Sequence, residues 1–167
     1  MAHSTAAADA AHLAEQYRTN DPFALAESVG AEVVFADLGA LKGLYTCIDD
    51  SRFLVVGNHL DDDTARIVCA HELGHDQLHR ALVHNSFLRE TDLFRMNDAT
   101  EYEANLFAAA LLLPDEEVLQ MVRDGQTIDE IAASTRTDPN LVALKLKCLS
   151  RKGYAFNDFD YRSDFLR

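Results

Sequence analysis

Apolar and polar residues follow two different patterns along this chain of 167 residues. Between residues 31 and 58 short apolar runs rich in Val, Phe, Leu and Tyr are separated by polar turn residues, which is typical of β-strands. The predicted strands are 32–35, 43–48 and 52–56, with a turn at 49–51 between the last two. We expect them to form a small antiparallel sheet.

Elsewhere the apolar positions recur at helical spacing. Asp21-Pro22 and Asp138-Pro139 each place an N-cap residue before a proline at the first helical position, and Thr127 with Glu130 forms a capping box. Pro114 ends the helix before it. The predicted helices are 6–18, 22–29, 62–82, 98–113, 115–123, 128–135 and 139–151. Strands followed by helices indicate the α+β class.

The length predicts one domain, because domains typically contain about 100–200 residues. We therefore treat residues 1–167 as a single unit with five parts. These are a helical N-terminal segment (1–30), the small sheet (31–58), two long helices (62–113), a helical C-terminal part (115–153) and an aromatic tail (154–167).

Charge and composition exclude several classes of function. The chain has 15 Lys and Arg against 28 Asp and Glu, a net charge of −13, which disfavours direct nucleic-acid binding and suits a basic partner. The longest apolar run, 106–113, is too short for a membrane, which needs about 20 residues. Three cysteines and a start without the features of a secretory signal indicate the cytoplasm.

The residues His71-Glu72-Leu73-Gly74-His75 match H-E-x-x-H within a predicted helix. Histidines four residues apart share one helix face, so both rings can reach one metal ion. Glu72 lies about 100° round the helix, where it can take a proton from a metal-bound water. The alternative is that both are core histidines whose ring nitrogens form hydrogen bonds and bind no metal. Gly74 argues against this alternative, because a mid-helix glycine costs about 1 kcal/mol and is usually tolerated where another backbone comes close.

A third ligand is needed, and the helix 98–113 offers Glu101 and Glu103. Glu101 shares the small-residue stripe of this helix with Asn105, whereas Glu103 points about 160° away. We therefore favour Glu101 as the ligand, with Asn105 orienting the ligands by hydrogen bonding. His79 lies about 12 Å along the helix from His71, too far to bind the same ion. The metzincin class is excluded, because it needs Gly and His where this chain has Leu78 and Ala81.

These two segments resemble the ImmA/IrrE family of zinc metallopeptidases. The hallmark of that family is H-E-x-G-H followed about 25 residues later by E-x-x-A-N-x-F-A-A-x-L-L-x-P, and residues 71–75 and 101–114 match every fixed position. The resemblance covers roughly residues 30–150. It implies a zincin-like fold with a Zn²⁺ cofactor, in which His71, His75 and Glu101 bind the zinc and Glu72 is the general base of peptide-bond hydrolysis.

Resemblance to zinc peptidases of this general type also suggests that the strand before the metal-binding helix, residues 52–56, pairs with an extended substrate. The group that stabilises the oxyanion stays open among Tyr102, His79 and His84. Cys69 points away from His71 and is expected in the core.

Members of the resembled family typically cleave a helix-turn-helix repressor encoded beside them, so the implied substrate is a DNA-binding repressor of a mobile element or stress response. A non-proteolytic protein that retains the zinc fold to bind a partner, antitoxin-like or immunity-like, is the alternative. A second alternative is DNA binding by 128–135 and 139–151, because segment 136–152 carries a local charge of about +4. The oligomeric state is left open.

The aromatic tail, 154–167, lies outside the resemblance. It contains Tyr154, Phe156, Phe159, Tyr161 and Phe165. A tail that folds over the core is the simpler interpretation. The more specific hypothesis is that it occupies a substrate cleft, of the same chain or of a neighbouring one.

Overall fold

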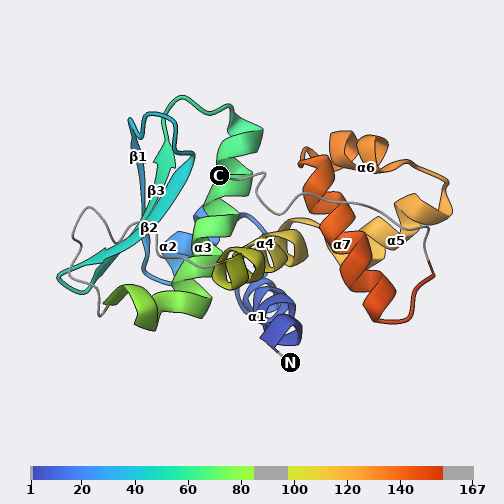
Figure 1. The fold of residues 1–167 in the computed structure, drawn as a ribbon, viewed down its shortest axis with the longest axis horizontal. Helices are drawn as coiled ribbons and strands as arrows, with labels where there is room; N and C mark the ends of the chain where they lie inside the picture. Colours follow the sequence, from blue (N-terminus) through green and yellow to red (C-terminus); the bar gives the residue numbers. More distant parts are fainter. Residues whose placement is uncertain (1, 85–97, 156–167) are drawn as a thin grey trace.

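The structure is a computed structural model, and it describes residues 2–84 and 98–155 (Figure 1). The helices, in chain order, are α1 (Ala2–Tyr17), α2 (Pro22–Ser28), α3 (Asp62–His84), α4 (Asp98–Leu112), α5 (Asp115–Arg123), α6 (Ile128–Thr135) and α7 (Pro139–Arg151). The strands are β1 (Glu32–Ala36), β2 (Gly43–Ile48) and β3 (Ser51–Gly57), between α2 and α3. The expected α+β class is confirmed. Nearly all of the aromatic tail lies outside the described residues.

The sheet is mixed, in the order β1-β3-β2, so the prediction of an antiparallel sheet is wrong for one pair of strands. β2 and β3 form an antiparallel hairpin, whose turn residues Asp49 and Asp50 both have positive φ, at 47° and 65°. β1 pairs in parallel with the other edge of β3. The connection 37–42 carries the chain from β1 across β3 to β2, a distance of two strand spacings or about 10 Å. The pattern of apolar residues does not predict this crossing.

This order also overturns the expectation that residues 52–56 form the edge that pairs with a substrate. They belong to β3, which is the central strand and has a neighbour on both sides. Within the described residues, β1 and β2 are the edge strands of this sheet.

Helix α3 lies at the centre of the molecule. It packs against β2 and β3 on one side and against α4 on the other, while α4 in turn packs on α1 and α7 (Figure 1). Both faces of α3 are apolar, and Val68, Cys69 and Leu73 are at most 1% exposed. The sequence-based expectations of a buried α3 and a core position for Cys69 are both confirmed.

Helices α3 and α4 come close together at Gly74. A Cβ atom added there would lie 3.1 Å from Ala104 Cα and 3.1 Å from Phe107 Cβ. These atoms belong to the backbone or lie next to it, so no side-chain rotation can relieve the crowding. The expectation that another backbone approaches this glycine is confirmed.

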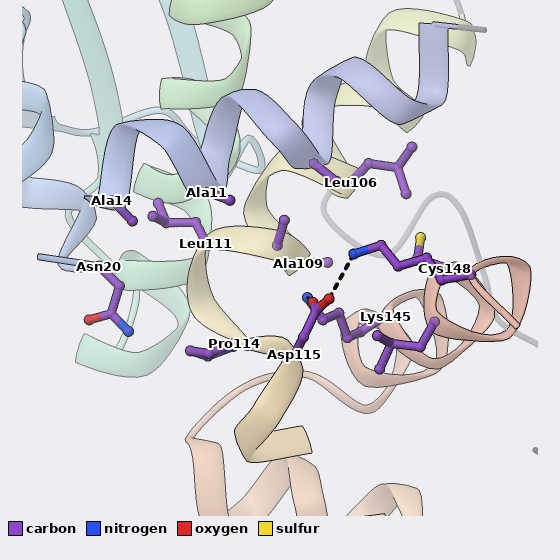
Figure 2. A pocket seen from close by; sticks show the side chains of 14 residues that line it. Ala11, Ala14, Asn20, Leu106, Ala109, Leu111, Pro114, Asp115, Lys145 and Cys148 are labelled. Carbon is purple, nitrogen blue, oxygen red and sulfur yellow. Dashed lines mark hydrogen bonds and ion pairs between the residues drawn. The ribbon is translucent and has the colours of Figure 1, made fainter. Parts of the chain in front are cut away.

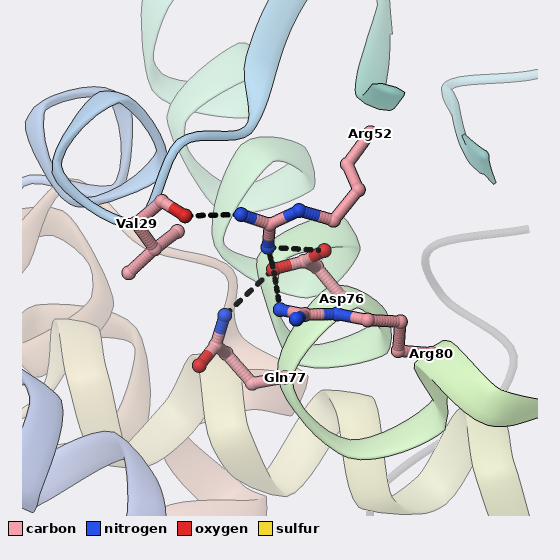
Figure 3. A network of polar contacts seen from close by, with 5 residues as sticks. All are labelled: Val29, Arg52, Asp76, Gln77 and Arg80. Atoms are coloured by element: carbon pink, nitrogen blue, oxygen red, sulfur yellow. Dashed lines mark hydrogen bonds and ion pairs between the residues drawn. The ribbon is translucent and has the colours of Figure 1, made fainter. Parts of the chain in front are cut away.

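A polar network ties α3 to the sheet beside this crossing (Figure 3). The Asp76 side chain is fully buried and accepts hydrogen bonds from Arg52 Nη1 of β3, at 2.7 and 3.0 Å. Arg80 Nη2 and Gln77 Nε2 also donate to Asp76. Arg52 Nη2 donates to the carbonyl of Val29, at the end of α2. A buried carboxylate is tolerated only with such partners, so the network holds β3, α2 and α3 in one arrangement.

No helix in residues 2–84 or 98–155 is long and apolar enough to cross a membrane.

Replacing Gly74 by alanine tests the helix crossing. Overpacking costs about 1–3 kcal/mol and the helix preference of alanine returns about 1 kcal/mol, so we expect a net loss of about 1 kcal/mol in the free energy of unfolding. Urea unfolding of the metal-free protein measures it. Ser134→Ala, at an exposed position in α6, reports helix preference alone. A gain in stability with Gly74→Ala would show that the two helices can separate at no cost.

Candidate metal centre

Two helices bring the predicted ligands together. α3 supplies His71 and His75, one turn apart, and α4 supplies Glu101. The Nε2 atoms of the two histidines are 3.1 Å apart. The Glu101 carboxylate reaches both, with Oε2 at 3.3 Å from His71 Nε2 and Oε1 at 3.4 Å from His75 Nε2.

This spacing fits a zinc ion. Tetrahedral zinc with bonds of about 2.0–2.1 Å holds neighbouring ligand atoms about 3.3 Å apart. Here the two Nε2 atoms are 3.1 Å apart, and each lies 3.3–3.4 Å from one oxygen of the Glu101 carboxylate. Two imidazoles and one carboxylate are also a donor set of catalytic zinc sites, in which the fourth position stays open. The donor set and its spacing therefore both suit zinc.

The far nitrogen of each histidine is also held. His71 Nδ1 lies 2.9 Å from the Oδ1 atom of Asn105, which is 2% exposed. An amide oxygen accepts only, so His71 carries its proton on Nδ1 and turns the lone pair of Nε2 toward the cluster. This is the orienting position that the sequence suggested for Asn105.

His75 is held differently. Its Nδ1 atom lies 3.0 Å from His79 Nδ1, and His79 Nε2 lies 3.0 Å from Glu103 Oε2. Glu103 is thus not among the three predicted ligands, but its side chain contacts the same helix as Glu101 does, which the helical spacing did not predict. The available signal was the continuation of the His71–His75 series to His79, one turn further along α3.

Glu72 lies beside this cluster and is 6% exposed. Burial raises the pKa of its carboxyl to about 7. The charge of Glu101 adds to this rise, while His71 and a hydrogen bond from the backbone amide of Tyr45 oppose it. A carboxyl group with a pKa near neutrality is suited to general-base catalysis.

Gly43 makes room for Glu72. A Cβ atom at this position of β2 would lie 2.5 Å from Glu72 Oε1 and 2.4 Å from Val68 Cγ1, so both side chains would have to shift. Glycine here therefore leaves the Glu72 carboxylate in its observed position. Local sequence patterns do not indicate this role for Gly43, because the contact joins segments that are 29 residues apart.

Electrostatics acts in different directions on the three predicted ligands. Burial lowers the pKa of His75 to about 4, so its ring is neutral at physiological pH. Burial alone would raise the pKa of Glu101, but hydrogen bonds and charge from the two histidines outweigh it and hold that pKa well below its usual range. For His71, burial favours the neutral ring, but the Glu101 and Glu72 carboxylates outweigh it and raise the pKa. Metal binding therefore displaces a proton from His71 more readily as the pH rises.

The candidates for stabilising an oxyanion have separate positions. The Tyr102 hydroxyl contacts Arg151 Nη1 of α7 at 3.4 Å. His79 is engaged by His75 and Glu103. The side chain of His84 lies outside the described residues. The assignment of this role is left open.

Comparison with known proteins agrees with this geometry. A family model described as the IrrE N-terminal-like domain, Peptidase_M78, matches residues 26–147. The chain belongs to the ImmA/IrrE family. The matched span includes the sheet and every residue of the cluster, and it agrees with the roughly 30–150 expected from the motifs. This ImmA/IrrE chain is therefore related to hydrolases of the metallopeptidase type.

A relative of this ImmA/IrrE protein occurs in Bacillus phage phi105, under the name "uncharacterized immunity region protein 2". The two are 35% identical over 134 residues, which is 80% of this chain and 84% of the phage protein. The similarity thus extends over most of both chains.

The raised pKa of Glu72 predicts that Glu72→Gln stabilises the metal-free protein at high pH. The pKa is about 7 when folded and 4.5 when unfolded, so the wild type loses stability as the pH rises through this window. Glu72→Gln has no carboxyl to ionise and does not lose this stability. The difference in the free energy of unfolding between the variant and wild type should therefore grow from near zero at pH 4 to about 3 kcal/mol at pH 8. Urea unfolding in the presence of a chelator measures this. Glu117→Gln, on the exposed face of α5, is the control, and a pH-independent difference would contradict the expectation.

Proposed function

We propose that this protein is a zinc-dependent endopeptidase that hydrolyses a peptide bond in a protein substrate. The observation that carries the proposal is the cluster of two histidine nitrogens 3.1 Å apart with the Glu101 carboxylate 3.3–3.4 Å from both, and the Glu72 carboxylate buried beside them. His71, His75 and Glu101 are the proposed ligands, and Glu72 is the proposed general base.

The chemistry that zinc supplies at such a site is Lewis acidity, which activates a water and polarises the substrate carbonyl. Glu72 accepts a proton from the attacking water and returns it to the nitrogen of the departing amine, as the C–N bond breaks. Its pKa near 7 in the metal-free protein lets it do both at physiological pH, and a cation nearby would lower that pKa. The buried position of Glu72 limits competing proton exchange with solvent.

The edge of β2 is the surface that we propose for substrate binding. β2 pairs with β3 on one side, and no strand in the described part of the chain pairs with its other side. The Tyr45 amide of this strand contacts the Glu72 carboxylate, so β2 leads directly to the proposed base. An extended peptide could add to this edge by main-chain hydrogen bonds.

We propose a DNA-binding repressor of a mobile element as the substrate. The phage relative is named for an immunity region, which is consistent with that class of substrate. The net charge of −13 favours a basic partner. A stress-response repressor would have the same chemistry. We place the reaction in the cytoplasm, since no disulfide joins the three cysteines, all of which are described.

The basic residues of α6 and α7 do not support DNA binding by the chain itself. Arg136 pairs with Asp63 at 2.7 Å. Lys145, only 4% exposed, and Lys152 both pair with Asp115, at 2.6 and 2.7 Å (Figure 2). Three of the five cations of segment 136–152 thus pair with carboxylates of other elements, which reduces the local positive charge available to a nucleic acid.

Cleavage of a purified helix-turn-helix repressor, chosen from the genes that neighbour this one, tests the proposal. Wild type loaded with zinc should cut it, and Glu72→Gln should cut it about 10²–10⁴-fold more slowly, because the general base is lost. Gel electrophoresis and mass spectrometry measure the products, and Glu117→Gln is the control. If wild type and Glu72→Gln bind the repressor and leave it equally intact, the protein is a partner-binding member of the family instead.

The choice of Glu101 over Glu103 is tested by zinc content. Glu101→Ala removes a proposed ligand and should bind zinc at least about 100-fold more weakly, whereas Glu103→Ala should still bind one zinc at micromolar concentrations. Atomic absorption after dialysis measures the stoichiometry. Loss of zinc from Glu103→Ala alone would reverse the ligand assignment.

A further inference from the structure

The two proposed histidine ligands have different supports. Asn105, a neutral amide, holds His71, whereas a second histidine backed by a carboxylate holds His75. His79 is not one of the proposed ligands, because its Nδ1 atom contacts His75 and its Nε2 atom contacts Glu103. Its side chain is buried, with 5% exposed, and these two contacts give both ring nitrogens a partner.

We propose that His79 and Glu103 are positioning residues that hold His75 in its metal-binding form, through the series His75–His79–Glu103. This inference rests on the zinc site proposed above. In this series Glu103 is the terminal hydrogen-bond acceptor, and His79 transmits the effect of its charge to His75.

The direction of the hydrogen bonds follows from proton counting. A neutral His75 whose Nε2 lone pair binds a metal must carry its proton on Nδ1, so it donates to His79 Nδ1 across 3.0 Å. His79, accepting on Nδ1, then carries its own proton on Nε2. That nitrogen donates to Glu103 Oε2, also at 3.0 Å. Each of the three residues is thereby satisfied with both histidines neutral and Glu103 ionised.

The charge of Glu103 gives the series its energetic effect. An anion at the far end stabilises positive charge that develops on His79 and His75 when Nε2 donates electrons to a cation, so His75 becomes the more basic ligand. His75 and His79 are buried, which reduces screening by water. The side chain of Glu103 is 21% exposed, and its Oε2 atom contacts His79 Nε2.

Zinc affinity of four variants tests the proposal, measured by competition with a chromophoric chelator. His79→Leu removes both hydrogen bonds and should weaken zinc binding about 10–100-fold. Glu103→Gln keeps an oxygen acceptor but removes the charge, so its affinity should lie between those of His79→Leu and wild type. His79→Asn offers an oxygen near the position of Nδ1 and should recover part of the loss. Glu117→Gln removes a charge outside the series and should bind zinc as wild type does.

Nitrogen-15 NMR of the histidine rings provides a readout that packing alone would not change. We expect a proton on His79 Nε2 in wild type, with or without zinc, and a smaller population of this tautomer in Glu103→Leu. The proposal would be overturned if His79→Leu and Glu103→Gln both bound zinc as tightly as wild type does. It would also be overturned by a proton on His79 Nδ1 in wild type. Failure of wild type to bind zinc would instead overturn the proposed function, and the tautomer of His79 in the metal-free protein would still decide whether the series exists.

Discussion

The contact between α3 and α4 at Gly74 is the constraint on which the metal centre depends. Its ligand atoms come from both helices, and their separations of 3.1–3.4 Å tolerate little displacement. A side chain at residue 74 would meet Ala104 Cα and Phe107 Cβ, so the absence of one sets how closely the helices approach. Glu101 lies one turn before Ala104 on α4 and His75 directly follows Gly74 on α3, so the distance between the helix axes sets how closely Glu101 approaches the two histidines.

A second constraint acts from the opposite side of α3. Gly43 lets β2 pass against Val68 and Glu72, and the buried Asp76 joins this helix to Arg52 of the sheet. Together these contacts hold Glu72 in a site with little access to water, where a charged carboxylate is costly. The protein thus gives up some stability at neutral pH to keep a carboxyl group with a pKa near 7 beside the proposed zinc.

The charges of this acidic chain serve different purposes in different places. Glu72 and Glu101 lie in the metal centre, Glu103 lies behind it, and Asp115 pairs with two lysines of the C-terminal helices. The overall charge of −13 is therefore not only a surface property. Part of it is built into the interior, where partners of opposite charge or hydrogen-bond donors compensate it.

Much of this molecule follows from the sequence alone. Caps and helical periodicity located the helices, with α6 and α7 at their predicted bounds, and local spacing placed His71, His75 and Glu101 on inward faces. These features depend on residues a few positions apart. Only the tertiary structure decided that β1 pairs with β3, that Gly43 makes room for Glu72 and that Glu103 contacts His79. Each of these joins residues more than 20 positions apart, and periodicity shows which face of an element is buried but not which distant element will cover it.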